Sequence, residues 1–119
     1  MGKKILVVDD DPFLGEMIKD MLEWYEYDIV LSKTACDTVE NSISNNVDLI
    51  ILDKLISGTD GTEVCQWIRG NDETNAIPIL MMTAMHEARE VCLEAGATDF
   101  ISKPFEMEAF VTAVKNLTE

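Results

Sequence analysis

Short apolar runs alternate with amphipathic stretches along the whole chain. The runs are three to six residues long, which is typical of buried strands. The stretches between them carry apolar residues every three or four positions, which predicts helices. The first helix shows this best, because its apolar residues from Phe13 to Tyr25 form one stripe and Pro12 suits its first turn. The predicted strands are 5–8, 29–31, 48–53, 77–82 and 100–102, and the predicted helices are 12–25, 34–44, 62–69, 87–95 and 106–117.

Strands that alternate with helices predict a parallel sheet with helices on both of its faces. The run 48–53 is apolar on both faces and should therefore be central. The stretch 54–61 holds two glycines and no periodicity, which predicts a loop. Neither a linker nor a repeat interrupts the pattern. We therefore expect an α/β fold with a doubly wound, five-stranded parallel sheet, forming one domain over residues 1–119.

Charge narrows the classes of partner. The chain has 119 residues, with 23 acidic and nine basic side chains and a formal net charge of −14. The phosphates of a nucleic acid would repel such a surface, and so would an anionic membrane. We therefore expect no direct nucleic-acid partner and no membrane partner. A basic protein or a bound cation would relieve the charge.

The cysteines and the apolar runs bear on the compartment. Cys36, Cys65 and Cys92 are an odd set without a closely spaced pair, which favours reduced and mostly buried thiols and a cytoplasmic location. No apolar stretch approaches the ~20 residues of a membrane span. The first apolar run is too short for the core of a signal peptide.

Polar side chains follow four of the predicted strands. Asp9 and Asp10 follow the first, Asp53 ends the third, Thr83 follows the fourth and Lys103 follows the fifth. The carboxyl ends of parallel strands share one edge of the sheet, where open α/β folds place their sites. Clustered carboxylates raise one another's pKa unless a cation lies among them, and Mg²⁺ accepts such ligands. The pattern predicts Mg²⁺ beside a reactive Asp53, which can accept a phosphoryl group that Thr83 and Lys103 bind.

Each of these residues alone has a simpler explanation. An aspartate pair before a helix is often a capping device, and a threonine or lysine at a strand end is often only solvated. Five suitable residues at the ends of four strands are difficult to explain by capping alone. The joint pattern therefore favours a site.

At these positions the sequence resembles the receiver domain of two-component response regulators, over nearly the whole chain. The resemblance implies a flavodoxin-like (βα)5 fold with strand order 2-1-3-4-5. It also implies that Asp53 accepts a phosphoryl group from a sensor histidine kinase or phosphotransfer protein and that the signal passes to a downstream output protein or domain. No enzymatic activity beyond self-catalysed phosphoryl transfer and autodephosphorylation is implied. The matching stretches are ILVVDDDP at 5–12, DLIILD at 48–53, DG at 60–61, MTA at 82–84, AGA at 95–97 and KPF at 103–105.

The resemblance assigns a metal-binding role to four residues. Asp9, Asp10 and Asp53 would hold Mg²⁺ with their carboxylates. The backbone carbonyl of Leu55 would be a further ligand.

The resemblance also implies how the phosphoryl group acts. Thr83 and Lys103 would bind it, and Phe100 matches the aromatic residue that turns inward when the threonine moves. The responding surface would comprise the fourth helix, the fifth strand and the fifth helix. The peptide bond before Pro104 is usually cis in this family.

The chain departs from the family pattern in two places. Ile56-Ser57 stand where the family usually has Met-Pro. The spacing from Thr83 to Lys103 is about two residues shorter than is common, and we place the shortening near Met85 and His86. The second residue after Asp53 and after Thr83, Leu55 and Met85, is apolar, from which we expect slow loss of the phosphoryl group.

Two other functions are consistent with parts of the sequence. A degenerate receiver would act as a docking module without being phosphorylated. A phosphatase of the haloacid-dehalogenase type would use the Asp-x-Asp of Asp9 and Asp11, although Phe13 stands where that class has Thr or Val.

Overall fold

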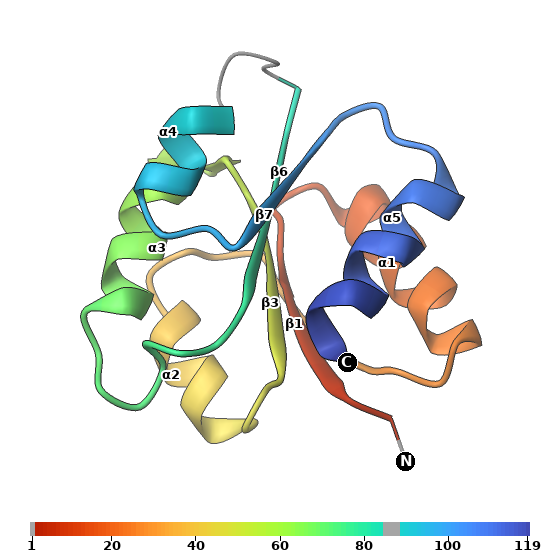
Figure 1. The fold of residues 1–119 in the computed structure, drawn as a ribbon, viewed down its shortest axis with the longest axis horizontal. Coiled ribbons are helices and arrows are strands. Elements are labelled where there is room, and N and C mark those ends of the chain that lie inside the picture. The colour runs from red at the N-terminus through yellow and green to blue at the C-terminus, as the bar shows by residue number, and fades with distance from the viewer. Residues whose placement is uncertain (1, 85–88) are drawn as a thin grey trace.

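The computed structural model describes residues 2–84 and 89–119, so the expectations for Met85 and His86 lie outside the described residues. A five-stranded parallel sheet runs through the middle of the molecule in the order β2-β1-β3-β6-β7 (Figure 1). This arrangement confirms the expected doubly wound sheet, and its order matches 2-1-3-4-5 once the strands of a small hairpin are left out of the numbering. The strands are β1 Lys4–Val8, β2 Asp28–Ser32, β3 Leu49–Asp53, β6 Ile79–Thr83 and β7 Asp99–Ser102.

The helices lie on the two faces of this sheet. In Figure 1, α1 and α5 cover one face, and α2, α3 and α4 cover the other. No helix within the described residues combines the length and the apolar character that crossing a bilayer requires. The helices are α1 Pro12–Trp24, α2 Thr38–Ser44, α3 Gly61–Arg69, α4 Arg89–Glu94 and α5 Met107–Thr118.

Side-chain alternation along the strands builds one hydrophobic core on each face. In β1, Ile5 and Val7 join the core beneath α1 and α5, whereas Leu6 and Val8 join the core beneath the other three helices. Strands β3 and β6 alternate in the same way. Every residue of β3 and β6 is buried, because helices cover both faces of the sheet. The sequences of these two strands are therefore apolar at every position before Asp53 and Thr83.

Two local expectations were wrong. The stretch after β3 is not irregular, because it forms an antiparallel hairpin of β4 Leu55–Ile56 and β5 Thr59–Asp60. Helix α2 begins at Thr38 instead of residue 34. There the hydroxyl of Thr34 donates to the carboxylate of Asp37 at 2.7 Å, and the Thr34 N–H donates to a serine hydroxyl. Such local bonds satisfy polar groups without a helix, which delays its start.

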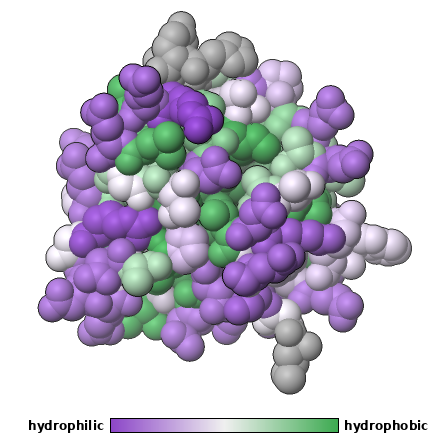
Figure 2. Space-filling view, viewed as in Figure 1, coloured by the Kyte–Doolittle hydropathy of each residue, from purple (hydrophilic) through white to green (hydrophobic). Residues whose placement is uncertain are grey.

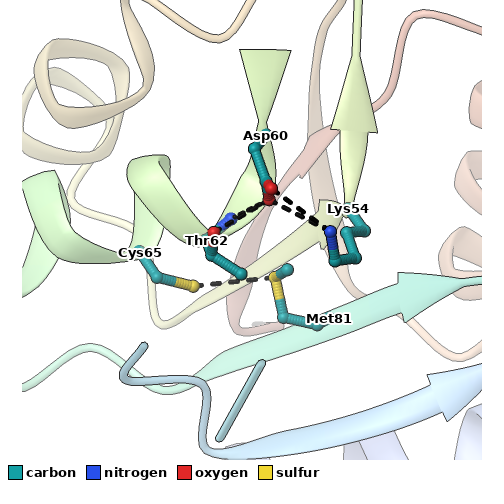
Figure 3. Close-up of polar contacts among 5 residues, drawn as sticks. All are labelled: Lys54, Asp60, Thr62, Cys65 and Met81. Carbon is teal, nitrogen blue, oxygen red and sulfur yellow. Dashed lines mark hydrogen bonds and ion pairs between the residues drawn. The ribbon is translucent and has the colours of Figure 1, made fainter. Parts of the chain in front are cut away.

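The hairpin is fastened to the sheet and to α3 through Asp60. Its carboxylate accepts bonds from the N–H and hydroxyl of Thr62 at 2.9 and 2.8 Å and pairs with the ammonium of Lys54 at 3.2 Å (Figure 3). Burial alone would raise the pKa of Asp60, but the Thr62 bonds and Lys54 outweigh it and lower that pKa. A side chain at Gly61 would collide with the backbone carbonyl of Asp53. The hairpin therefore lies tightly against the end of β3.

The three cysteines are free thiols, as the sequence analysis expects. Cys65 and Cys92 are buried, whereas Cys36 is exposed. Burial raises the pKa of the Cys65 thiol to about 12, and its Sγ lies 3.6 Å from the Sδ of Met81 (Figure 3). Cys65 therefore acts as a small packing residue of the core.

The contrast between two isoleucines tests the two-core arrangement. Ile51 is fully buried in β3, whereas Ile43 on α2 is 38 % exposed. We expect Ile51→Ala to lower the free energy of unfolding by about 2–5 kcal/mol, because it leaves a cavity in a central strand. The matched change Ile43→Ala should alter it by no more than about 0.5 kcal/mol. Urea denaturation measures both, and equal losses would contradict this account of the core.

The anchor at Asp60 predicts a pH-dependent loss of stability. We expect Asp60→Ala to destabilise the protein by about 1 kcal/mol at pH 7, because α3 loses its cap. Since the folded-state pKa of Asp60 lies below the ordinary value of 3.8, the stabilisation is complete above that value and is lost as the pH falls through the folded-state pKa. Urea denaturation of parent and variant from pH 7 to pH 3 should therefore show the gap narrowing on acidification.

The variant Asp60→Asn is the matched control, because it keeps a capping oxygen and loses the charge. It should be less destabilised than Asp60→Ala at pH 7. A gap between the parent and Asp60→Ala that widens as the pH falls would refute the assignment.

Candidate functional site

The carboxyl ends of four strands deliver the predicted site residues to one edge of the sheet. Asp9 follows β1, Asp53 and Thr83 are the last residues of β3 and β6, and Lys103 follows β7. The strand registers align these ends, since Asp53 lies opposite Met82 in β6. Asp53, Thr83 and Lys103 line one cavity of about 350 Å³ together with Lys54, Leu55, Asp60 and Ala84.

Three carboxylates converge beside this cavity. Asp9, Asp10 and Asp53 each offer one oxygen, and these oxygens lie within 4.8 Å of one another. Asp9 is 3 % exposed and Asp53 is 9 % exposed, whereas Asp10 faces solvent. Burial raises the pKa of Asp9 and Asp53, and negative neighbours raise both values further. The charged form of this cluster is therefore held in an unfavourable environment.

The positive charge nearest to the cluster is the ammonium of Lys103. Its Nζ lies 3.3 Å from Oδ1 of Asp53 and 3.9 Å from Oδ2 of Asp9. The shorter contact is an ion pair that lowers the pKa of Asp53 against the effect of burial. The longer one exceeds hydrogen-bond distance. One lysine therefore faces three carboxylates and does not neutralise them.

One oxygen of the Asp9 carboxylate accepts no hydrogen bond from the described residues. Its Oδ1 accepts the N–H of Asp11 at 2.9 Å, but its buried Oδ2 has no hydrogen-bond partner among the described residues. A buried carboxylate oxygen rarely lacks a hydrogen bond, because the loss of its hydration destabilises the folded protein. A buried carboxylate oxygen without a hydrogen bond, in a cluster of three carboxylates, belongs to a donor set suited to a hard divalent cation. The residues present therefore fit Mg²⁺.

Two side chains next to the cluster have other tasks. The Oδ1 atom of Asp11 accepts the N–H groups of Phe13 and Leu14 at 3.0 and 3.4 Å, so Asp11 caps α1. Lys54 is turned to Asp60, as described above. Capping therefore explains Asp11, but it does not explain Asp9 and Asp10, whose carboxylates accept the N–H groups of Asp11 and Ser57 instead.

The remaining predicted residues lie around the same edge. Thr83 is buried at the wall of the cavity. Phe100 in β7 is half-buried and packs against the core beneath α2, α3 and α4. The Lys103–Pro104 peptide bond is cis. Leu55, the predicted source of a carbonyl ligand, lies in the hairpin with its side chain 63 % exposed.

One contact of the site was missed by the sequence analysis. The backbone N–H and the hydroxyl of Ser57 donate to Oδ2 of Asp10 at 2.8 and 3.2 Å. The Ser-Gly pair at 57–58 is a turn signal and could have indicated a hairpin. Nothing in the sequence could have indicated that the turn reaches a carboxylate 47 residues earlier in the chain.

Known proteins resemble this chain in sequence and in structure. The transcriptional regulatory protein ResD of Bacillus subtilis is 40 % identical over 116 residues, which cover 96 % of this chain and 47 % of ResD. The chain thus spans about half the length of the curated relatives it matches. A response regulator structure from Chloroflexus aurantiacus, itself described as putative, has a TM-score of 0.93 at 32 % identity and covers 99 % of this chain and 98 % of its own.

A second solved structure is described with a bound metal ion. It is the receiver domain of the sensor histidine kinase PA1611 from Pseudomonas aeruginosa, described with a magnesium ion coordinated in its active-site cleft. Its TM-score is 0.89 at 28 % identity, with 99 % of this chain and 98 % of that chain covered. The family model for the response regulator receiver domain matches residues 5–115. With its parallel sheet and its acidic edge, the chain belongs to the response regulator receiver domain family.

Proposed function

We propose that Asp53 accepts a phosphoryl group from a phosphohistidine on a sensor kinase or phosphotransfer protein, or from a small donor such as acetyl phosphate, in a Mg²⁺-dependent reaction. One observation carries the proposal. The nearly buried Asp53 carboxylate lies 3.3 Å from Lys103 and close to the carboxylate of Asp9, whose Oδ2 has no hydrogen-bond partner among the described residues. Two-component signalling is the function of the family to which the chain belongs.

The metal ligands would be the carboxylates of Asp9, Asp10 and Asp53 and the backbone carbonyl of Leu55. The convergence of the three carboxylates supports this set, and so does the magnesium ion described for the PA1611 receiver domain. When bound, Mg²⁺ offsets the negative charge of the carboxylates and of the transferring phosphoryl group. The chain's own residues supply the rest of the chemistry.

In the transfer, an Asp53 carboxylate oxygen attacks the phosphorus of the phosphohistidine. A new O–P bond forms as the N–P bond breaks, and the donor imidazole nitrogen keeps the electron pair and takes up a proton. Lys103 supports this step twice, because its ammonium favours the ionised form of Asp53 and lies where the phosphoryl oxygens arrive. Thr83 at the cavity wall would donate its hydroxyl to the same oxygens.

Phosphorylation would then change the face built by α4, β7 and α5. Thr83 would move toward the phosphoryl group. Phe100, which is half-buried and lies opposite Met81 in the register of β6 and β7, would turn into the vacated space. Reversing a population from 1:99 to 99:1 requires about 5.5 kcal/mol. Two charge-assisted hydrogen bonds contribute about 3–5 kcal/mol. The phosphoryl group alone therefore shifts the equilibrium partly, and an output partner completes the shift.

A groove beside β7 and α5 supports the proposed output face. This groove of about 740 Å³ lies between β7 and α5, and its lining includes Ile101, Phe105 and Ala109. Apolar patches show between hydrophilic side chains near the middle of Figure 2, where β7 lies in Figure 1. A protein surface rather than a nucleic acid suits this acidic chain, whose formal net charge is −14. The three free thiols support a cytoplasmic location.

The two alternative functions receive less support. The docking module needs no reactive carboxylate, so it leaves the Asp9 oxygen that has no hydrogen bond among the described residues without a role. The phosphatase of the haloacid-dehalogenase type needs the second aspartate of its motif in the site, but Asp11 caps α1.

Intact-mass analysis tests the proposed acceptor. Incubated with acetyl phosphate and Mg²⁺, the parent should gain one phosphoryl group and Asp53→Ala none, because Asp53 is the nucleophile. The control Asp72→Ala removes an exposed carboxylate remote from the cavity lining and should gain one group, as the parent does. Removal of the metal with EDTA should abolish the gain. Phosphorylation of Asp53→Ala would overturn the assignment, and no phosphorylation of the folded parent would favour the docking module.

The lifetime of the phosphoryl group should depend on Leu55. Its exposed apolar side chain lines the cavity and offers no group to orient an attacking water molecule. We expect Leu55→Asn to shorten the half-life of the phosphorylated form severalfold once the donor is removed, whereas the apolar control Leu55→Met should leave it nearly unchanged. Mass analysis over time gives both half-lives. A faster decay in the parent than in Leu55→Asn would count against the idea.

A further inference from the structure

We propose that Ser57 is a positioning residue of the metal site, in that its backbone N–H holds the Asp10 carboxylate among the other ligands. This inference rests on the proposed Mg²⁺ site and assigns it a residue that the sequence pattern does not. The Ser57 N–H donates to Asp10 Oδ2 at 2.8 Å, and the Ser57 hydroxyl donates to the same oxygen at 3.2 Å.

Asp10 needs such a restraint more than the other two carboxylates do. Asp9 and Asp53 end or follow buried strands and are themselves almost buried, so packing fixes their positions. Asp10 is exposed, and its carboxylate lies close to two like charges that repel it. Without a restraint, repulsion and hydration would both favour a conformer that points into solvent. Within the ranges 2–84 and 89–119, the donors that bond to the Asp10 carboxylate are the two groups of Ser57.

The turn of the hairpin aims the Ser57 N–H at Asp10. Ser57 and Gly58 form the two-residue connection between β4 and β5, with φ angles of +48° and +86°. Positive φ at both central residues is the pattern of the hairpin turns that best match strand twist. Proline, which the family usually has at the position of Ser57, has no N–H and cannot adopt a positive φ. The bond to Asp10 is therefore a consequence of this chain's departure from the family pattern.

The same hairpin ties two proposed ligands together. Leu55, whose carbonyl is the fourth proposed ligand, begins β4 two residues before Ser57. The other end of the hairpin is fixed through Asp60 to Thr62 and Lys54. The bond from Ser57 to Asp10 thus fixes the position of the Asp10 carboxylate relative to the Leu55 carbonyl before the metal binds. Groups that orient metal ligands in this way typically change metal affinity by about 10–100-fold.

A pair of substitutions separates the N–H from the hydroxyl. Ser57→Gly keeps the N–H and favours a positive φ, and loses only the hydroxyl. Ser57→Pro loses both groups and the turn geometry. Titration with MgCl₂, followed by NMR of backbone amides at the site, gives the dissociation constants. We expect Ser57→Pro to bind Mg²⁺ at least about tenfold more weakly than the parent, equivalent to about 1.4 kcal/mol, and Ser57→Gly to stay within about threefold.

Urea denaturation in EDTA separates positioning from general stability, because it measures both variants without the metal. A folded Ser57→Pro variant that binds Mg²⁺ within about twofold of the parent would refute the role of Ser57. A parent that binds no Mg²⁺ would instead refute the proposed metal site. The two failures are therefore distinguishable.

A second measurement needs no variant to fold. In the metal-free parent, the Ser57 amide should exchange with solvent at least about tenfold more slowly than the neighbouring Gly58 amide, because only the former is bonded to a carboxylate within the described structure. Equal exchange rates would show that the bond is not kept in solution and would overturn the inference.

Discussion

Electrostatic repulsion among three carboxylates is the constraint on which the rest of this structure depends. Two of them, Asp9 and Asp53, are nearly buried, and the nearest ammonium group, that of Lys103, forms an ion pair with only one of them within hydrogen-bond distance. Buried carboxylates that lie close together destabilise the folded state, so other interactions must hold them in place. Strands β1 and β3 hold them, because the apolar residues of these strands are fully buried up to the carboxylates. Hydrophobic burial along the strands thus offsets the unfavourable charge at their ends.

A site held in this way is prepared to bind positive charge and then a phosphoryl group. Burial raises the pKa of Asp9 and Asp53, and their negative neighbours raise both values further, so added positive charge would stabilise the ionised carboxylates. The other lysine that lines the cavity does not neutralise the cluster, because Lys54 is paired with Asp60. The cluster of carboxylates at this edge therefore favours the binding of a cation.

The sequence predicted most of this arrangement because the carboxyl ends of parallel strands share one edge of the sheet. Asp9 follows β1 and Asp53 ends β3, and the observed register, with Val8 opposite Leu52, brings them together. The hairpin escaped prediction because its strands are two residues long and carry no periodicity. Ser57 escaped for a different reason. Its role depends on a bond that spans 47 residues, and such a long-range bond leaves no mark in the local sequence. The late start of α2 likewise followed from side-chain bonds that compete with the helix.

The position of a bound divalent ion tests the account most directly. Mn²⁺ prefers the same oxygen ligands as Mg²⁺ and gives an anomalous diffraction signal, so a soaked crystal locates the ion. The account predicts one strong peak among the carboxylates of Asp9, Asp10 and Asp53, within coordination distance of the Asp9 oxygen that has no hydrogen bond within the described structure. A peak elsewhere, or none at this edge at saturating Mn²⁺, would contradict it.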